Sequence, residues 1–151
     1  MPLDTNTAGI QVNALVTPQA PIGLTAVVTT ANSTYTDSPT NSVEFLPASG
    51  SAISTVAPRG MRLSKVTALA RATNTATELQ LFVSDSTGAT KRFIASAVMP
   101  AYTVAQTTKQ TAADFGFTDA APLILQAGER LWLATGVANT GIVGRAEGGA
   151  Y

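Results

Sequence analysis

Apolar and polar residues alternate over short stretches of this chain, and clusters of Gly, Pro, Ser, Asn and Asp separate the stretches. Alternation with a period of two is the pattern of a β-strand that buries one of its faces. The expected strands cover residues 10–16, 24–30, 43–46, 61–69, 78–83, 91–98, 123–126, 130–137 and 142–147. About eight short strands, with a turn about every ten residues, predict an all-β fold, namely a jelly-roll-like antiparallel β-sandwich.

The clearest hairpin joins the strands expected at 78–83 and 91–98. Asp85 can accept hydrogen bonds from the backbone of the turn, and Gly88 can adopt a positive φ without steric cost. A second strand–turn–strand unit runs from residue 123 to residue 137 through Gly128. Both units support an antiparallel arrangement.

Two of the expected strands leave open which face is buried. In the first, one side carries Met61, Leu63, Lys65, Thr67 and Leu69, and the other carries Arg62, Ser64, Val66 and Ala68. In the second, Trp132 faces outward, towards a partner or a covering loop, if Leu131 and Leu133 face the core. A Trp buried in a strand that is covered on both sides is the alternative.

Residues 104–113 are the one stretch expected to form a helix, and their Gln and Thr content makes that helix a weak one. No internal repeat and no shift in composition divides the 151 residues, of which 45% are hydrophobic. We therefore expect one globular sandwich domain over residues 23–151. Residues 1–22 are expected to be an extended N-terminal arm or, alternatively, the first strand of the sandwich.

The composition restricts the chemistry. The chain has no His and no Cys, which excludes nucleophilic triads, thiolate chemistry and ordinary zinc sites. Nine basic residues balance nine acidic ones, so no basic patch for nucleic acid is expected. Polar residues and prolines interrupt every long uncharged stretch, and no signal peptide is visible, so no membrane partner is expected either.

Two pairs of carboxylates are the candidates for acid–base chemistry, Asp114 with Asp119 and Glu129 with Glu147. Ordinary roles in turns and on solvated surfaces explain such residues equally well. The turn at Asp85 lacks the alternating oxygen ligands of a helix-loop-helix calcium site, although sandwich loops can bind calcium without a fixed spacing. We expect no catalytic residue, no cofactor and no metal, and hence no enzyme.

Two short motifs near these residues have structural explanations. Asp114-Phe115-Gly116 matches the magnesium-binding triplet of protein kinases, but the rest of the kinase signature is missing, so a turn is expected. Glycines cluster near residue 145 without a helix pattern after them, which argues against a dinucleotide site. Close approach of strands or a bulge is the expected use of Gly141, Gly144, Gly148 and Gly149.

Several blocks of the sequence resemble small proteins of tailed-phage virions. The blocks are Asn32-Ser33-Thr34-Tyr35, Phe45-Leu46-Pro47-Ala48, residues 70–82 (ARATNTATELQLF), residues 125–131 (LQAGERL) and residues 141–151 (GIVGRAEGGAY). Many proteins of this kind look like capsid decoration (cement) proteins. The familiar pattern often has a Gly after the Tyr-Asp of its first loop, whereas here Tyr35-Thr36-Asp37-Ser38 stands there.

The resemblance implies a structural protein on the outside of the capsid, made in the cytoplasm of a host bacterium. Its partner would be the major capsid protein, and homo-oligomers, trimers or dimers, are expected. The residues that we expect at contacts between subunits are Ile10, Val12, Leu15, Val16, Trp132 and Tyr151. The alternative function is a receptor- or carbohydrate-binding module of a head or tail fibre. A small lyase or hydrolase that uses Asp or Glu is a third interpretation, without positive support in the sequence.

Overall fold

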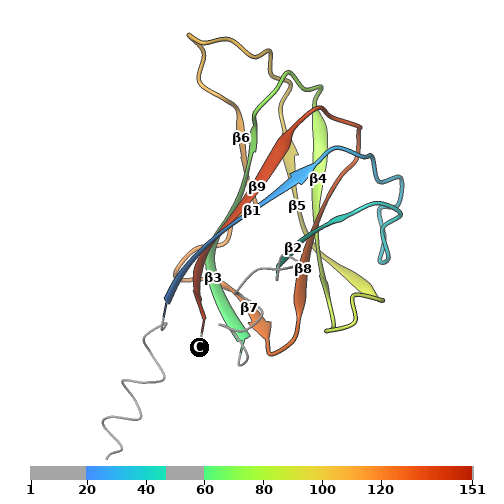
Figure 1. Ribbon diagram of the computed structural model, residues 1–151, viewed down its shortest axis with the longest axis vertical. Coiled ribbons are helices and arrows are strands. Elements are labelled where there is room, and N and C mark those ends of the chain that lie inside the picture. Colours follow the sequence, from blue (N-terminus) through green and yellow to red (C-terminus); the bar gives the residue numbers. More distant parts are fainter. Residues whose placement is uncertain (1–19, 47–59, 151) are drawn as a thin grey trace, which may run out of the picture.

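The computed structural model describes residues 20–46 and 60–150, and all regular structure in these residues is β (Figure 1). The strands are β1 (Ala20–Val28), β2 (Val43–Leu46), β3 (Gly60–Ala70), β4 (Thr77–Ser84), β5 (Lys91–Met99), β6 (Ala112–Asp114), β7 (Leu123–Gln126), β8 (Arg130–Thr135) and β9 (Ile142–Ala150). They form two antiparallel sheets packed face to face, which confirms the predicted all-β sandwich.

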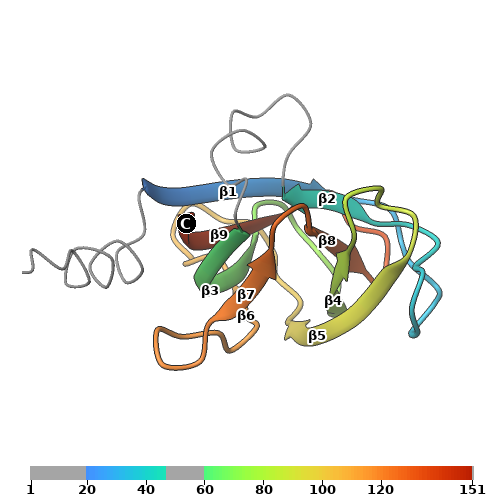
Figure 2. The ribbon, with the colours of Figure 1, turned by 90° about the horizontal axis from the view of Figure 1, so that it is seen from below.

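The two sheets have different orders of strands. The five-stranded sheet has the order β1-β9-β3-β6, and β7 pairs with β3 on the edge that β6 also uses. The four-stranded sheet has the order β2-β8-β4-β5. Seen from below, β1 runs beside β2 at one side of the sandwich, while β5 lies at the other side near β6 and β7 (Figure 2).

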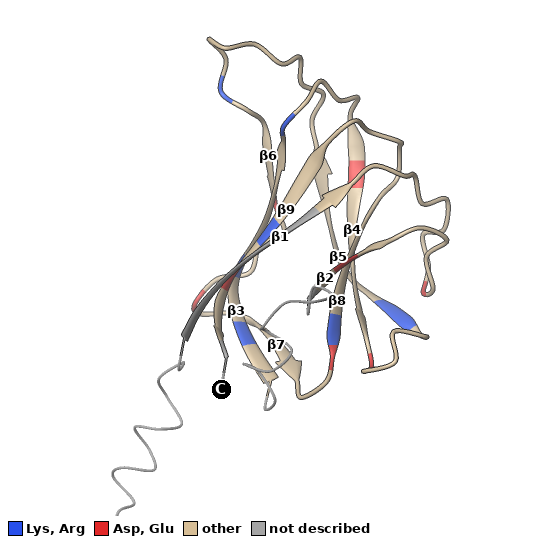
Figure 3. Ribbon diagram, in the orientation of Figure 1, with Lys and Arg blue, Asp and Glu red and all other residues tan. Residues whose placement is uncertain are grey.

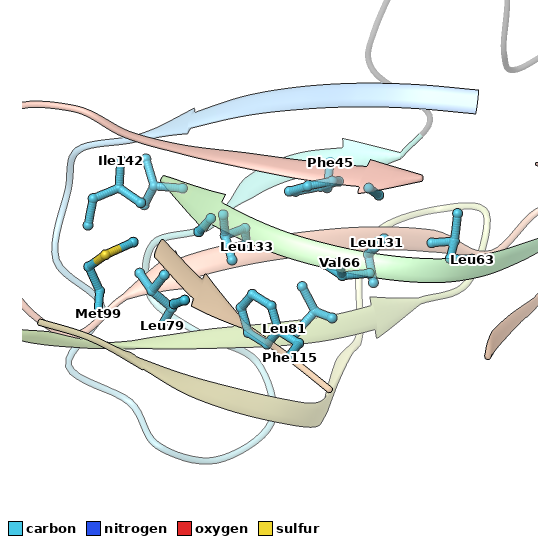
Figure 4. Packing of buried hydrophobic residues seen from close by; sticks show 14 of the residues in the cluster. Phe45, Leu63, Val66, Leu79, Leu81, Met99, Phe115, Leu131, Leu133 and Ile142 are labelled. Carbon is cyan, nitrogen blue, oxygen red and sulfur yellow. The ribbon is translucent and has the colours of Figure 1, made fainter. Parts of the chain in front are cut away.

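The core is built from alternate residues of the facing strands. Leu79, Leu81 and Val83 point inward from β4, and Leu131 and Leu133 point inward from β8 (Figure 4). Full burial of each such leucine contributes about 1.5–3 kcal/mol. The hairpin between β4 and β5 is confirmed. The expected strand–turn–strand order of β7 and β8 through Gly128 is also confirmed, but the two strands belong to different sheets and do not pair with each other.

A β-bulge in β3 determines which of its residues face the core, which the sequence left open. Met61 and Leu63 lie in the core, and the register against β9 then shifts between Leu63 and Lys65. After the shift, Val66 and Ala68 lie in the core as well. Strict alternation is therefore wrong for this strand, because one extra residue moves all later side chains to the opposite face.

Two of the glycines in β9 are needed for close packing. A Cβ on Gly148 would overlap the backbone of Arg62 and lie 2.7 Å from Cα of Leu63, at the bulge. A Cβ on Gly144 would lie 2.7 Å from Cδ2 of Leu133, in the core. These contacts confirm the predicted close approach for both residues. Gly141 differs, because its nearest neighbour would be Cβ of Ala72 at 3.7 Å.

The predicted helix at 104–113 is wrong. Residues 104–111 form an exposed loop, and β6 begins at Ala112. Tyr102 pairs with Asn74 at the start of this loop and donates its hydroxyl to the carbonyl of Thr108. Anchoring by tertiary contacts thus replaces a helix that the Gln- and Thr-rich sequence would stabilise only weakly.

The N-terminal boundary is placed by the pairing of β1 with β9. Residues 20–22 belong to β1, because Ala20, Pro21 and Ile22 pair with the end of β9. The strand expected at 10–16, with Ile10, Val12, Leu15 and Val16, lies outside the described residues. Tyr151 also lies outside them.

The turn between β4 and β5 has the predicted chemistry. Oδ1 of Asp85 accepts hydrogen bonds from the backbone N–H of Thr87 at 2.9 Å, from its hydroxyl at 2.6 Å, and from the N–H of Gly88 at 3.1 Å. Gly88 adopts a φ of 73°. The bonds from Thr87 hold the pKa of the Asp85 carboxyl below its ordinary value of 3.8.

Gly148→Ala is expected to destabilise the fold by about 3 kcal/mol, because the added methyl group overlaps backbone atoms that cannot rotate away. Gly141→Ala is the matched control and should change the free energy of unfolding by less than about 0.5 kcal/mol. Urea denaturation followed by circular dichroism measures both values. Equal stability of the two variants would show that the bulge tolerates a side chain.

Asp85→Asn is expected to flatten the acid side of the stability profile. A carboxyl whose pKa is lower in the folded state stabilises the fold above its unfolded pKa, and this contribution is lost as the pH falls through the folded pKa. Denaturation at several pH values between about 4 and about 2 should therefore show a smaller loss of stability for the variant than for the wild type. Parallel profiles would contradict this role of the turn.

Candidate binding surfaces

Trp132 lies on the outer face of the four-stranded sheet and is half-buried there. Leu131 and Leu133 face the core, so the outward orientation is the correct one of the two that the sequence allowed. The indole N–H donates to Oγ of Ser84 at 2.8 Å, and Nζ of Lys91 lies 4.2 Å from the ring centroid. These contacts stabilise the ring within its own chain, and a contact of Trp132 with another subunit stays a prediction.

The loop over residues 29–42 covers part of this outer face (Figure 2). Its anchor is Asn32, which is fully buried. The amide of Asn32 donates to Oε1 of Gln80 at 2.7 Å and to the carbonyl of Thr34 at 2.6 Å. Its Oδ1 accepts from the backbone N–H of Thr40 at 2.9 Å and from the Thr40 hydroxyl at 3.0 Å. The covering loop explains why Gln80 and Phe82 are buried although they point away from the core.

The same loop closes the first part of the free edge of β5. The backbone N–H of Phe93 donates to Oδ1 of Asp37 at 2.7 Å, and the N–H of Ser38 donates to the carbonyl of Lys91 at 2.7 Å. Ile94 is the extra residue of a bulge, because Phe93 pairs with Phe82 and Ala95 pairs with Leu81. From Ile94 to Met99, the outer edge of β5 has no backbone hydrogen-bond partner in the described part of the chain.

A groove of about 480 Å³ lies between β5 and β7, and we call it the β5–β7 groove. The groove lies where the edge strands of the two sheets meet. Its lining residues are Asp37, Val83, Arg92, Phe93, Ile94, Leu123, Ile124, Gln126 and Glu129. Phe93, Ile94 and Ile124 are 40%, 38% and 45% exposed, which is high for large apolar side chains. Arg92 and Glu129 form an ion pair of 3.5 Å, and both residues also line a smaller hollow beside the Asp85 turn.

The outer face of the five-stranded sheet carries side chains in rows across the strands. The first row is apolar and consists of Val27, Val143, Leu69 and Ala112, which are paired neighbours on β1, β9, β3 and β6. In the next row, Arg145 stands beside Thr67 and Asp114; in the third, Glu147 stands beside Lys65. We call this surface the β9 face. These three rows present two positive and two negative side chains beside a short apolar stripe, and Arg62, further along β3 on the same face, forms an ion pair with Asp119.

The carboxylate pairs that the sequence offered for catalysis have local structural partners. Asp114 accepts from the N–H of Gly116, and Asp119 forms an ion pair of 3.1 Å with Arg62. Glu129 pairs with Arg92, and Glu147 pairs with Arg145 at 3.1 Å. Asp114-Phe115-Gly116 forms the expected turn, with Phe115 in the core and Gly116 at a φ of 83°.

Positions of both charge signs are scattered over the ribbon (Figure 3). Within residues 20–46 and 60–150, no three carboxylates gather into a cluster that would hold a metal ion. The same residues contain no helix that is long and apolar enough to span a bilayer.

Comparison with known proteins finds no match: no family description, no curated protein and no solved structure is similar to this chain.

The buried position of Asn32 and the β5–β7 groove were not predicted from the sequence. Asn32 stands in a polar stretch that is typical of a solvated loop, and its partners Thr40 and Gln80 are 8 and 48 residues away. The groove depends on the bulge at Ile94, which separates this residue from the regular alternation of β5. Neither feature has a local signal, because both arise from pairings between distant segments.

Asn32→Ala should destabilise the protein by about 2–3 kcal/mol, because it leaves the buried amide oxygen of Gln80 without its donor and releases Thr40. Ser33→Ala, at the exposed neighbouring position, is the control and should change stability by less than about 0.5 kcal/mol. Denaturation in urea compares the two. Tryptophan fluorescence of Asn32→Ala under native conditions should in addition report a more solvated Trp132, and an unchanged spectrum would show that the loop stays closed without its anchor.

Proposed function

We propose that this protein is a structural, non-catalytic protein of a tailed-phage virion, which binds the outside of the capsid lattice and stabilises the DNA-filled head. The sequence resemblance supports this role. The observation that carries it in the structure is the β5–β7 groove, where apolar side chains and an unpaired strand edge are exposed together.

The groove suits a segment of another protein. Apolar patches with a polar rim are typical of surfaces that bind proteins. An extended segment can add a strand to a free edge through backbone hydrogen bonds, while pockets beside the edge select its side chains. Among the residues that the structure describes, none pairs with the edge of β5 from Ile94 to Met99, next to exposed Ile94 and Ile124. We therefore propose an extended segment of the major capsid protein as the occupant.

Binding to a lattice does not require a tight single contact. A ligand that binds only the assembled shell stabilises it by mass action, and contacts between neighbouring copies add avidity. The balanced charges favour such protein contacts over attraction to a polyanion.

The groove favours a protein segment over a sugar. Carbohydrate platforms usually combine several aromatic rings, whereas Phe93 is the aromatic residue among the side chains that line this groove. The rings of Phe93 and Phe82 pack edge to face, with 5.7 Å between the centroids, so part of the Phe93 ring is already engaged within the chain. If the protein does not bind capsids, the alternative function is a receptor- or carbohydrate-binding module of a fibre.

The test is saturable binding of the purified protein to empty, expanded capsids of its own phage. The wild type should bind at on the order of hundreds of copies per particle and raise the capsid melting temperature. Ile94→Glu should weaken binding at least about tenfold, since it places a charge in the groove. Val137→Glu, at an apolar residue of similar exposure outside the groove, should bind within about twofold of the wild type.

No binding of the folded wild type would contradict the virion role, and a glycan screen would follow. Equal loss in both variants would contradict the groove as the docking site. Circular dichroism of the variants confirms that each one is folded before binding is compared.

A further inference from the structure

We infer that the β9 face is the contact surface for a second copy of this chain, in a symmetric dimer with its two-fold axis along the strands, between β9 and β3. This inference stands on the rows of side chains described above and does not depend on the capsid role.

The pattern of the face is complementary to itself. Rotation by 180° about an axis that runs between β9 and β3 places β9 of one copy over β3 of the other, and β1 over β6. Val143 then faces Leu69 of the second copy, and Val27 faces Ala112, so apolar residues meet apolar residues. Face-to-face packing of aligned strands is also the ordinary way in which two sheets pack.

The charged row has the same complementarity. In this arrangement Glu147 of each copy faces Lys65 of the other, and symmetry produces the pair twice. Arg145 faces Thr67, so its own ion pair with Glu147 is retained without a like charge opposite. The three rows carry Arg145 and Lys65 against Glu147 and Asp114, and Arg62 on the same face is paired with Asp119, which gives a balance that a strongly acidic or basic partner would not match.

The size of the face fits a modest, reversible dimer. β1, β9 and β3 run side by side over about nine residues, and the short strands β6 and β7 extend the other edge of β3, which gives a surface at most about 19 Å wide and about 30 Å long. Two such surfaces bury about 1,100 Å² in total, which is just above the lower limit for specific interfaces. The exposed fraction of Val27, 54%, marks apolar surface that the dimer would remove from water.

Charge reversal tests the pairing between copies. Lys65→Glu alone sets a carboxylate opposite Glu147 of the second copy, and Glu147→Lys alone sets an ammonium group opposite Lys65. Each variant should dimerise at least about tenfold more weakly than the wild type, because the repulsion occurs twice. In a mixed dimer of the two variants, each of the two pairs across the interface joins a carboxylate to an ammonium group. An equimolar mixture should therefore recover dimers.

Sedimentation velocity of the full chain between about 1 and about 500 µM measures these equilibria, with Lys109→Glu in an exposed loop as the control. Recovery by mixing is a signature that a change in the fold of either variant cannot produce. A wild type that stays monomeric over this range overturns the inference. So does a dimer that both variants retain at wild-type affinity, or a mixture that stays as weak as the single variants.

Discussion

The close approach of β9 and β3 at Gly148 is the constraint on which most of this structure depends. The missing side chain allows the bulge between Leu63 and Lys65, and the bulge keeps both halves of β3 facing the core. β3 is central to the five-stranded sheet, because it pairs with β9 on one edge and with β6 and β7 on the other. Without the extra residue, Val66 and Ala68 would point to solvent, and the sandwich would lose the inward side chains of its central strand.

The bulge also shapes the two surfaces that we consider functional. β6 and β7 pair with β3 on either side of it, so this edge of the sheet consists of two short strands rather than one long one. The second of them, β7, lines the β5–β7 groove. On its other edge β3 pairs with β9, and the shifted register there sets Lys65 beside Glu147. This pair completes the charged rows of the β9 face. A feature that first serves packing thus also shapes the two surfaces at which we propose that partners bind.

The two sheets differ in what covers them. The outer face of the four-stranded sheet is covered in part by the loop over residues 29–42, which the buried amide of Asn32 holds in place. The same loop protects the edge of β5 through Asp37 and Ser38, and edge protection of this kind limits uncontrolled association. Within the described residues, the edge of β5 from Ile94 to Met99 has no such protection.

Local patterns predicted the elements well and the site poorly, for a physical reason. Alternation and turn chemistry act between near neighbours, so the strands and the Asp85 turn could be predicted, whereas the orientation of Trp132 stayed open between two alternatives. The bulges in β3 and β5, the burial of Asn32 and the groove depend on pairings across tens of residues. A single sequence holds no signal for such pairings, and the weak helix expected at 104–113 was lost to them as well.

Hydrogen–deuterium exchange of the protein, free and bound to capsids, tests most directly that a partner segment pairs with the edge of β5. We expect the amides from Ile94 to Met99 that face the free edge to become protected on binding, because an added strand accepts hydrogen bonds from them. The amides of the loop at 104–111, away from the groove, should exchange at the same rate in both states. Saturated binding with unchanged exchange along β5 would contradict the account.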